Sequence, residues 1–397
     1  MQTLMLTFIK RYRTLLFFFF AYGFGFYIII QRALADLAQN GQHYRQADWL
    51  INNSAGLIRR GFGGDMLIFI SDITSISPVF LVVAVQVFLI SALFLTFSRI
   101  GWAARGNDSI LFLLISPVFL LFYAYDAGGS LRKEILGFSA FLPLLWGSGL
   151  TSLKFSVRPK KWPVLLSSAI FAVACFWHEL NVFFAPVLAV SVYFYFAGGG
   201  GGNWRLAFSS VYLIVAFSAG LFAMLFSSVP DITPICSALS DANELDHLCG
   251  GAIAWLDKDT TYALSRVWKM IISGNVFLPI TLLIALSYFI FLLGEFVSWK
   301  VIVTIYIGCL VLFSPLFIVA IDWGRWAVLA TFCFTVLILF YLRINDKITA
   351  LSFSTPVWLS CALFSSIWGV NHVGGSPVFT KGIYANIARI GAGLIGI

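Results

Sequence analysis

The sequence predicts an all-α fold: one integral membrane domain over residues 1–397, built as a bundle of about eleven transmembrane helices. Three observations support this fold class. Hydrophobic residues make up 60% of the chain and charged residues 11%, whereas about 25% of the residues in a soluble domain are charged. Apolar runs of about 20 residues, the length of one helical span, recur along the chain. The 41 Phe and 13 Trp residues suit contact with lipid and the aromatic belts of membrane interfaces.

The expected spans are the apolar runs, taken in order. They cover residues 13–31, 77–98, 109–125, 135–150, 163–177, 181–197, 207–228, 274–294, 301–320, 327–342 and 352–369. The first run lacks a small-residue cleavage site, so we expect an uncleaved span and not a signal peptide. The glycine run 198–202 predicts a flexible hinge. The Gly-rich tail from Asn371 is expected to lie in the membrane interface or to re-enter.

The orientation of the bundle follows from its loops. The 25 basic residues divide 13 to 12 between the two sides. Their number therefore does not indicate which side is cytoplasmic, and their placement in the loops must be used. The side of the N-terminus carries unopposed Lys and Arg in short loops, which predicts that it is cytoplasmic. The opposite side has the two long loops, about 32–65 and 229–270, and we expect these to be periplasmic in a bacterium.

Residues able to transfer protons are concentrated on that outer side. By these spans, 14 of the 17 acidic residues and all four His fall there. Proton transfer uses carboxylates and imidazoles, so any chemistry is expected at the outer face. A topological bias of acids away from the inner side is the alternative.

The first outer loop contains Asp48, the pair Arg59-Arg60 and the segment Gly61–Asp65. Guanidinium groups bind phosphate bidentately, and glycines allow backbone N–H groups to approach an anion. The loop therefore predicts a phosphate site. The alternative is an interfacial turn with snorkelling arginines.

A second set of charges lies between the third and fourth spans, where Asp126 is followed by Arg132-Lys133-Glu134. Three consecutive charges at membrane depth are costly unless they are paired or bind a ligand. They are therefore candidates for a substrate site. The alternative is a structural ion-pair network with Asp126.

His178-Glu179 ends the fifth span in an apolar context. Consecutive helical residues point about 100° apart, so the two side chains are not expected to share a metal ion, and an HExxH motif is absent. A general base, or a hydrogen-bonding partner for a sugar hydroxyl, is the predicted role. A simple interfacial turn is the alternative.

The segment Asp322-Trp323-Gly324-Arg325-Trp326 joins the ninth and tenth spans. Asp322 and Arg325 are spaced i,i+3 and can pair on one helical face. The tryptophans can anchor at the interface or stack on sugar rings. A purely structural pair and a substrate site are equally compatible with this pattern.

Cysteine placement predicts one disulfide. Cys236 and Cys249 lie in the long loop outside the expected spans, where an oxidising compartment allows a disulfide to form. The remaining cysteines are expected to be buried packing residues: Cys175, Cys309, Cys333 and Cys361.

Several classes of function are disfavoured. The net charge of +8 does not indicate nucleic-acid binding, because the basic residues are scattered over short loops. A nucleotide-binding GxxxxGK[ST] loop does not occur, and no cofactor or metal is expected. Paired halves with matching broken helices, as in many transporters, are not apparent.

The chain resembles the multispanning proteins of bacterial surface-polysaccharide clusters, namely O-antigen polymerases and the GT-C class of lipid-sugar glycosyltransferases. The resemblance covers the architecture of the whole chain, including a long outer loop late in the sequence. Asp48 best matches the acidic residue that GT-C enzymes carry in the first outer loop, and Asp65 is second. The outer-loop arginines of the polymerases are matched by Arg59, Arg60, Arg132 and Arg325. The chain departs from both families in having no clear signature motif and an arginine-poor long loop.

The resemblance implies an enzyme of the bacterial inner membrane that transfers a sugar or oligosaccharide from polyprenyl phosphate or pyrophosphate at the periplasmic face, in O-antigen or capsule assembly. The arginines and Lys133 would hold the leaving phosphate. The attacking hydroxyl would lose its proton to Asp48, Glu134, Glu179 or His178. The implied partners are lipid-linked glycan donor and acceptor, membrane lipids and other polysaccharide-assembly proteins.

Polymerisation is favoured within this resemblance, because several arginines suit two lipid-linked partners. A GT-C transferase that adds a single sugar to lipopolysaccharide is the first alternative. A transporter or flippase of lipid-linked sugars is the second, and it would need polar residues in both halves of the membrane.

Overall fold

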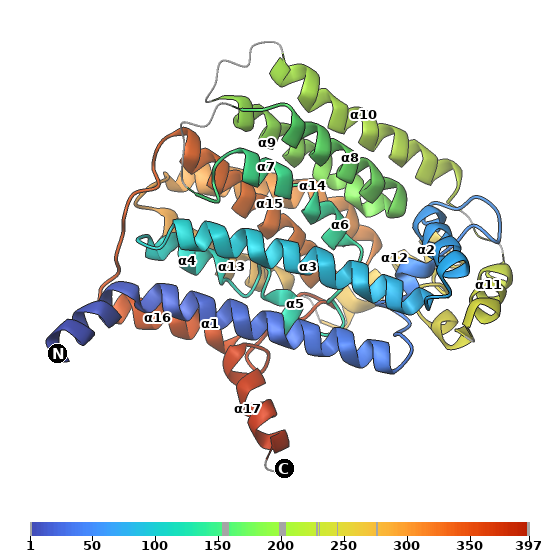
Figure 1. Ribbon diagram of the computed structural model, residues 1–397, viewed down its shortest axis with the longest axis horizontal. Helices are drawn as coiled ribbons and strands as arrows, with labels where there is room; N and C mark the ends of the chain where they lie inside the picture. Colours follow the sequence, from blue (N-terminus) through green and yellow to red (C-terminus); the bar gives the residue numbers. More distant parts are fainter. Residues whose placement is uncertain are drawn as a thin grey trace.

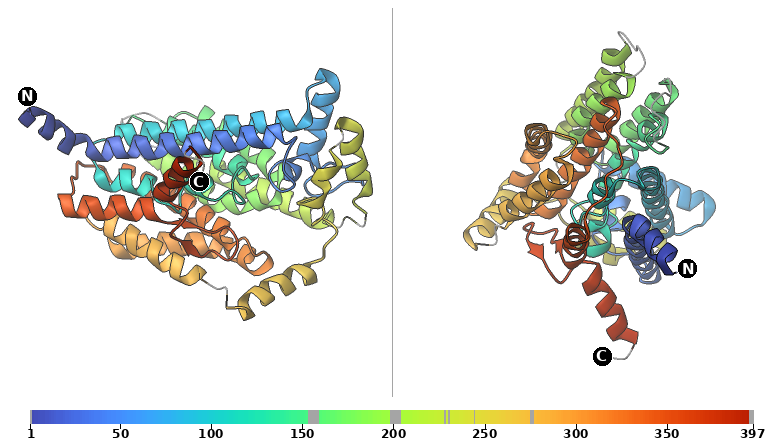
Figure 2. Two further views of the ribbon diagram at one scale, coloured as in Figure 1. Left: turned by 90° about the horizontal axis from the view of Figure 1, so that it is seen from below. Right: turned by 90° about the vertical axis from the view of Figure 1, so that its left-hand side faces the viewer.

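The computed structural model describes residues 2–152, 159–197, 204–227, 229, 231–243, 245–274 and 277–394. In this part of the chain the fold is all-α apart from one pair of two-residue strands. The long helices lie side by side in an elongated bundle, with α10 at the top and α1 near the bottom of Figure 1; Figure 2 gives two further views. The predicted hinge at 198–202 and the basic residues Lys154 and Arg158 lie outside the described residues.

The bundle is built from long apolar helices. They are α1 (Gln2–Ala38), α3 (Pro78–Ala103), α8 (Trp162–Trp177), α9 (Ala185–Ala197), α10 (Trp204–Leu225), α13 (Leu278–Leu293), α14 (Trp299–Val319), α15 (Trp323–Ile344) and α16 (Thr355–Ile367). Among the described residues, six helical segments are long and apolar enough to cross a membrane: Tyr12–Ala38, Pro78–Ala103, Glu179–Ala197, Trp204–Leu225, Trp299–Val319 and Trp323–Ile344.

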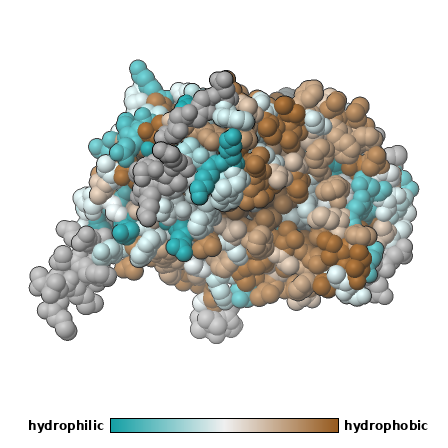
Figure 3. All heavy atoms as spheres, turned by 45° about the horizontal axis from the view of Figure 1, so that its top comes forward, coloured by the Kyte–Doolittle hydropathy of each residue, from teal (hydrophilic) through white to brown (hydrophobic). Residues whose placement is uncertain are grey.

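Helix α15 is the centre of the bundle. Its apolar window is 89% buried, against 17% for the window of α10. A helix that is hydrophobic on all sides is normally buried among its neighbours. On α10, by contrast, apolar side chains such as Phe217 point outward, 74% exposed. Figure 3 shows the resulting broad apolar surface in brown, with hydrophilic residues gathered towards its two ends.

All but two of the expected spans coincide with helices of the structure. Residues 109–125 form the short helices α4 (Asp108–Leu114) and α5 (Phe122–Tyr125), and residues 135–150 form α6 (Glu134–Ser139) and α7 (Leu142–Gly147). The expectation of two continuous spans here is wrong. Pro117 follows α4, and proline disfavours helix both for itself and for the residue before it.

The broken segment is enclosed by protein. Residues 108–126 are all buried, and they pack against α1, α3 and α13. Non-helical backbone at membrane depth is tolerated where protein surrounds it, because its polar groups then find partners.

The long loops carry short helices that the hydropathy pattern does not predict. These are the 3₁₀ helices η1 (Ala47–Leu50) and η3 (Asp246–Gly250), and the α-helices α2 (Gly61–Thr74), α11 (Thr233–Asn243) and α12 (Thr260–Ile272). A further 3₁₀ helix, η2 (Glu179–Phe184), joins α8 to α9. Helices α2 and α11 lie together at the right-hand end of Figure 1.

The C-terminal tail folds back onto the bundle. Strands β1 (Gly369–Val370) and β2 (Pro377–Val378) pair antiparallel and precede α17 (Ile383–Leu394). The backbone N–H of Gly324 donates to the carbonyl of His372 at 2.9 Å, so the hairpin covers the start of α15. A Cβ at Gly324 would lie 2.0 Å from the carbonyl oxygen of Asn371, so this contact requires glycine.

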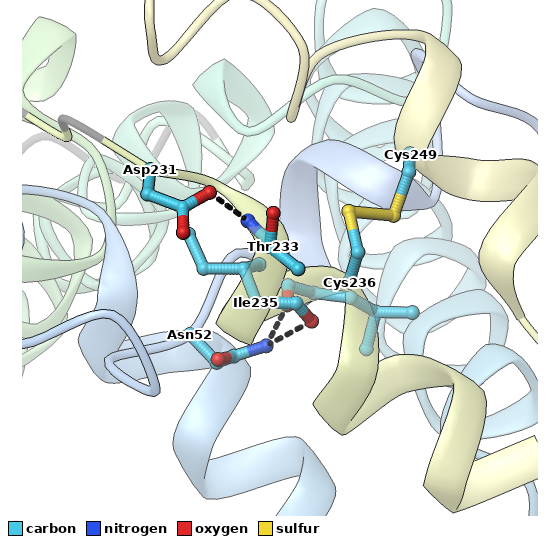
Figure 4. The surroundings of a disulfide bond; sticks show 7 residues. Asn52, Asp231, Thr233, Ile235, Cys236 and Cys249 are labelled. Carbon is cyan, nitrogen blue, oxygen red and sulfur yellow. Dashed lines mark hydrogen bonds between the residues drawn. A yellow bond between two sulfur atoms is a disulfide. The ribbon is translucent and has the colours of Figure 1, made fainter.

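The two cysteines of the long loop are joined by a disulfide (Figure 4). Cys236 of α11 and Cys249 of η3 have their Cα atoms 6.0 Å apart. The amide of Asn52 donates to the carbonyl of Ile235 at 3.5 Å, which links the disulfide region to the first long loop. As the sequence predicts, the other cysteines are buried and free: Cys175, Cys309, Cys333 and Cys361.

Candidate functional site

Most of the predicted site residues meet in one charged cluster at the end of the bundle that carries the long loops. The cluster consists of Asp48, Arg59, Arg60, Arg132, Lys133, Glu134, His178, Glu179, Asp322 and Arg325. These residues come from η1, the start of α2, the turn before α6, the junction of α8 and η2, and the start of α15.

Asp48 lies at the bottom of the cluster. Its side chain is 1% exposed, and it faces Arg132 at 3.7 Å, Lys133 at 3.9 Å and Arg60 at 4.0 Å. These separations are longer than hydrogen bonds. Both carboxylate oxygens lack a hydrogen-bond partner among the described residues. A buried ionised acid with free lone pairs is unusual, because such groups are normally paired.

The cations keep Asp48 ionised. Burial favours the neutral acid, but Lys133, Arg132, His178 and Arg60 outweigh it and hold the pKa of Asp48 well below its usual range. Burial lowers the pKa of Lys133 to about 8, and the charge of Asp48 limits this fall. Asp48 and Lys133 therefore carry opposite charges at neutral pH.

The loop around Asp48 is tied to the turn that carries Arg132 and Lys133. The indole N–H of Trp49 donates to the carbonyl of Leu131 at 3.1 Å, and the amide of Gln86 donates to the same carbonyl at 2.7 Å. Leu131 has a left-handed φ of 55°, which is unfavourable for a leucine and needs such support. The first bond joins η1 to the basic turn, and the second joins α3 to it.

Two of the predicted phosphate-binding residues already have carboxylate partners. The Arg60 Nε donates to both oxygens of Glu179 at 2.9 Å, and its Nη2 lies 2.5 Å from Oε1. Arg325 donates to Glu134 at 2.7 and 3.2 Å, and to Asp322 at 2.5 Å. The i,i+3 pair predicted for Asp322 and Arg325 is therefore confirmed, and Glu134 is a further partner.

Arg59 and Arg132 are held less firmly. The Nε of Arg59 is 3.7 Å from Glu179, and the Nε of Arg132 is 3.7 Å from Asp48. Neither Nε makes a hydrogen bond within the described chain. The side chain of Arg59 is 31% exposed, so the cluster opens to solvent on its side. The Nε atoms of these two guanidinium groups are therefore open to an anion, and beside them lies the buried Lys133 Nζ, which donates to the carbonyl of Trp177 at 3.4 Å.

His178 and Glu179 both belong to the cluster. The expectation that their side chains point about 100° apart, as consecutive residues of a helix do, is wrong. His178 has extended backbone angles, φ −156° and ψ 120°, because α8 ends at Trp177. Its Nδ1 accepts from the N–H of Leu180 at 3.1 Å and lies 3.4 Å from Glu179 Oε2. The bend lets both side chains face the same charges.

The glycines of the first loop allow close packing of the segments beside them. A Cβ at Gly61 would lie 2.0 Å from Asn53, one at Gly63 would lie 1.9 Å from Trp177, and one at Gly64 would lie 2.0 Å from the carbonyl of Ile51. Protein atoms already fill the space beside each glycine.

Asp65 also has a structural position. Its carboxylate accepts from the backbone N–H of Asn53 at 2.8 Å and from the Asn53 amide at 2.5 Å. These bonds close the loop between η1 and α2. Asp65, the second match for the acidic residue of the first outer loop, thus has both carboxylate oxygens bound to Asn53.

Asp126 lies in a separate network. It pairs with Lys381 and His372, and not with Arg132-Lys133-Glu134 as the alternative interpretation of that segment had it. His372 Nδ1 is 2.7 Å from Asp126 Oδ1, and the N–H of Gly129 donates to the same oxygen at 2.8 Å. His372 and Lys381 lie in the Gly-rich tail, about 250 residues further along the chain by their numbering, and no local pattern marks them as partners.

No protein-family model, curated protein or solved structure matches this chain. Its class is therefore defined by its own features: the described residues are almost entirely helical or connecting loops, and they include six helices long and apolar enough to cross a membrane. The cluster offers an ionised buried acid beside cations that are available to an anion.

Proposed function

We propose that this chain is a multi-pass protein of the bacterial inner membrane that transfers a sugar from a polyprenyl-phosphate donor at the periplasmic face, in surface-polysaccharide assembly. The observation that carries the proposal is Asp48, a buried carboxylate without a hydrogen-bond partner among the described residues, 3.7 to 4.0 Å from three cations. An ionised acid with free lone pairs can accept a proton from a sugar hydroxyl.

The proposed reaction is a displacement at the anomeric carbon of the donor sugar. The acceptor hydroxyl oxygen forms the new bond, the bond from that carbon to the phosphate oxygen breaks, and the hydroxyl proton passes to Asp48. Arg59, Arg132 and Lys133 stabilise the negative charge on the leaving phosphate. The bound phosphate also offsets the cations that hold the pKa of Asp48 low, so donor binding makes Asp48 a stronger base.

The charge of the cluster favours a donor with one phosphate. It contains five basic side chains and four carboxylates, which leaves a formal charge of +1 when His178 is neutral. A phosphodiester carries one negative charge, and a pyrophosphate carries more. With Arg60 and Arg325 already paired, the cluster suits one lipid-linked donor, and this favours the single-sugar transferase over the polymerase.

We further propose about eleven membrane crossings with a cytoplasmic N-terminus, two of them made by the broken segments 109–125 and 135–150. The motivation is the unopposed basic residues in the short loops on that side. Reporter fusions after Lys161 and after Arg343 are expected to report the cytoplasm, and fusions within 245–260 the periplasm. The reverse labelling would move the charged cluster to the cytoplasmic face and remove the need for a lipid-linked donor.

Gene deletion in the source bacterium tests the proposed function. We expect glycan chains of normal length that lack one sugar, seen by electrophoresis and mass spectrometry of the surface polysaccharide, with rescue by the wild-type chain. A ladder cut to one repeat would select the polymerase instead. Lipid-linked intermediates stalled on the cytoplasmic leaflet would select the flippase, and a glycan of unchanged structure and amount would refute all three.

A further inference from the structure

An apolar groove of about 560 Å³ runs along the side of the bundle. Helices α3 and α8 form its walls, and α6 and α7 form its floor. Its lining side chains are apolar apart from Ser139. Several of them are open to the outside, including Phe88 at 71% and Val173 at 44% exposure, so the groove is accessible from the lateral surface.

One end of the groove lies about one helical turn from the charged cluster. Its lining residue Leu136 stands three positions after Lys133, and its lining residue Val173 stands four positions before Trp177, about one helical turn in each case. Lys133 Nζ donates to the carbonyl of Trp177 at 3.4 Å, so the two elements meet at the cluster.

The other end of the groove is marked by aromatic residues. Trp146 of α7 and Trp162 of α8 line it there. Along α8, the distance from Trp162 to Val173 is about 16 Å at 1.5 Å per residue. The groove therefore extends about this far, with the charged cluster beyond one end and tryptophans at the other.

We infer that this groove binds the polyprenyl chain of the donor, with the donor phosphate at Arg59, Arg132 and Lys133. The inference rests on the proposed function and deepens it by assigning the site of the lipid tail. It follows from complementarity along the whole length: one end supplies cations for one phosphate, and the remainder supplies apolar surface for a chain.

Photo-crosslinking of the full-length protein in phosphatidylcholine nanodiscs tests the inference. Ala169 lines the groove and is replaced by benzoylphenylalanine. The matched control carries the same group at Ala207, an exposed position of α10 outside the groove. The probe is radiolabelled undecaprenyl phosphate. We expect labelling through position 169 to exceed labelling through position 207 by at least about tenfold, because a change of about 1.4 kcal/mol is tenfold in occupancy.

Two further arms make the result specific. Ala92 lines the groove on α3, and Ala92→Phe is expected to reduce the labelling at least about tenfold, whereas Ala207→Phe adds the same ring elsewhere and should not change it. Unlabelled undecaprenyl phosphate should compete, and dioleoylphosphatidic acid at the same mole fraction should not. Equal labelling at the two positions, or equal competition by phosphatidic acid, would identify the groove as a site for bulk bilayer lipid and overturn the inference.

An experiment can refute the groove as the polyprenyl site without refuting the proposed function, and the reverse. If deletion of the gene removes a sugar but Ala92→Phe restores it as well as the wild-type chain does, the function stands and the groove is refuted. If the probe labels position 169 specifically but deletion leaves the glycan unchanged, the groove stands and glycosyl transfer is refuted.

Discussion

Asp48→Asn is expected to lower the rate of sugar transfer by about two to four orders of magnitude, the range for loss of a general base. Asn keeps the shape of the side chain but replaces the ionised carboxylate, which accepts the proton, by a neutral amide. The measurement is transfer to the surface glycan in the deletion strain, with the variant and wild type expressed at equal levels. Photo-labelling of the groove by undecaprenyl phosphate should persist, because Asp48 does not hold the donor.

The control must separate lost chemistry from lost folding. Asp48 offsets the charge of Lys133, and its removal lowers the pKa of Lys133 further, which makes neutralisation of the lysine easier. The double variant Asp48→Asn with Lys133→Met removes one charge of each sign, so we expect it to elute as a folded protein on size exclusion. A folded single or double variant that transfers sugar at the wild-type rate would exclude Asp48 as the base.

Asp65→Asn is the matched control for Asp48. It makes the same chemical change to an acid of the same loop, whose contacts are with Asn53. Asn can still accept one of these two hydrogen bonds, so a cost of about 1 kcal/mol of stability and little loss of transfer are expected.

The apolar helices are predictable from sequence because backbone groups in a membrane must be satisfied within each segment. That rule places α3, α10 and α14 close to their observed bounds. It fails at residues 108–150, where the apolar runs form short helices and residues 108–126 are entirely buried by protein. Hydropathy measures burial, and it does not tell burial in lipid from burial in protein.

The members of the charged cluster are predictable individually, since a charge in an apolar context is costly unless it is used. Their pairing is not. Glu134 and Arg325 are 191 positions apart, and Arg60 and Glu179 are 119 apart. The arginines that are already paired therefore cannot be separated by sequence from those that remain available. The fold makes that distinction, and it changes the preferred donor.

Arg325→Met is expected to destabilise the protein by about 3–5 kcal/mol, the usual cost of removing one partner of a buried ion pair. The side chains of Arg325 and Glu134 are 3% and 1% exposed, so the change leaves the carboxylate of Glu134 without its bidentate partner. The other neighbour of Arg325, Asp322, is 26% exposed and can be hydrated. The measurement is the fraction of detergent-purified protein that stays monodisperse after heating.

The double variant Arg325→Met with Glu134→Leu should recover most of that stability, because replacing a buried ion pair by apolar residues of similar volume is often neutral or stabilising. The recovered protein then reports the role of the pair. Sugar transfer within about threefold of wild type would establish that Arg325 and Glu134 hold α15 against α6 and do not bind the phosphate. A folded double variant whose transfer is lost would return Arg325 to the set of phosphate ligands and contradict the single-phosphate assignment of the cluster.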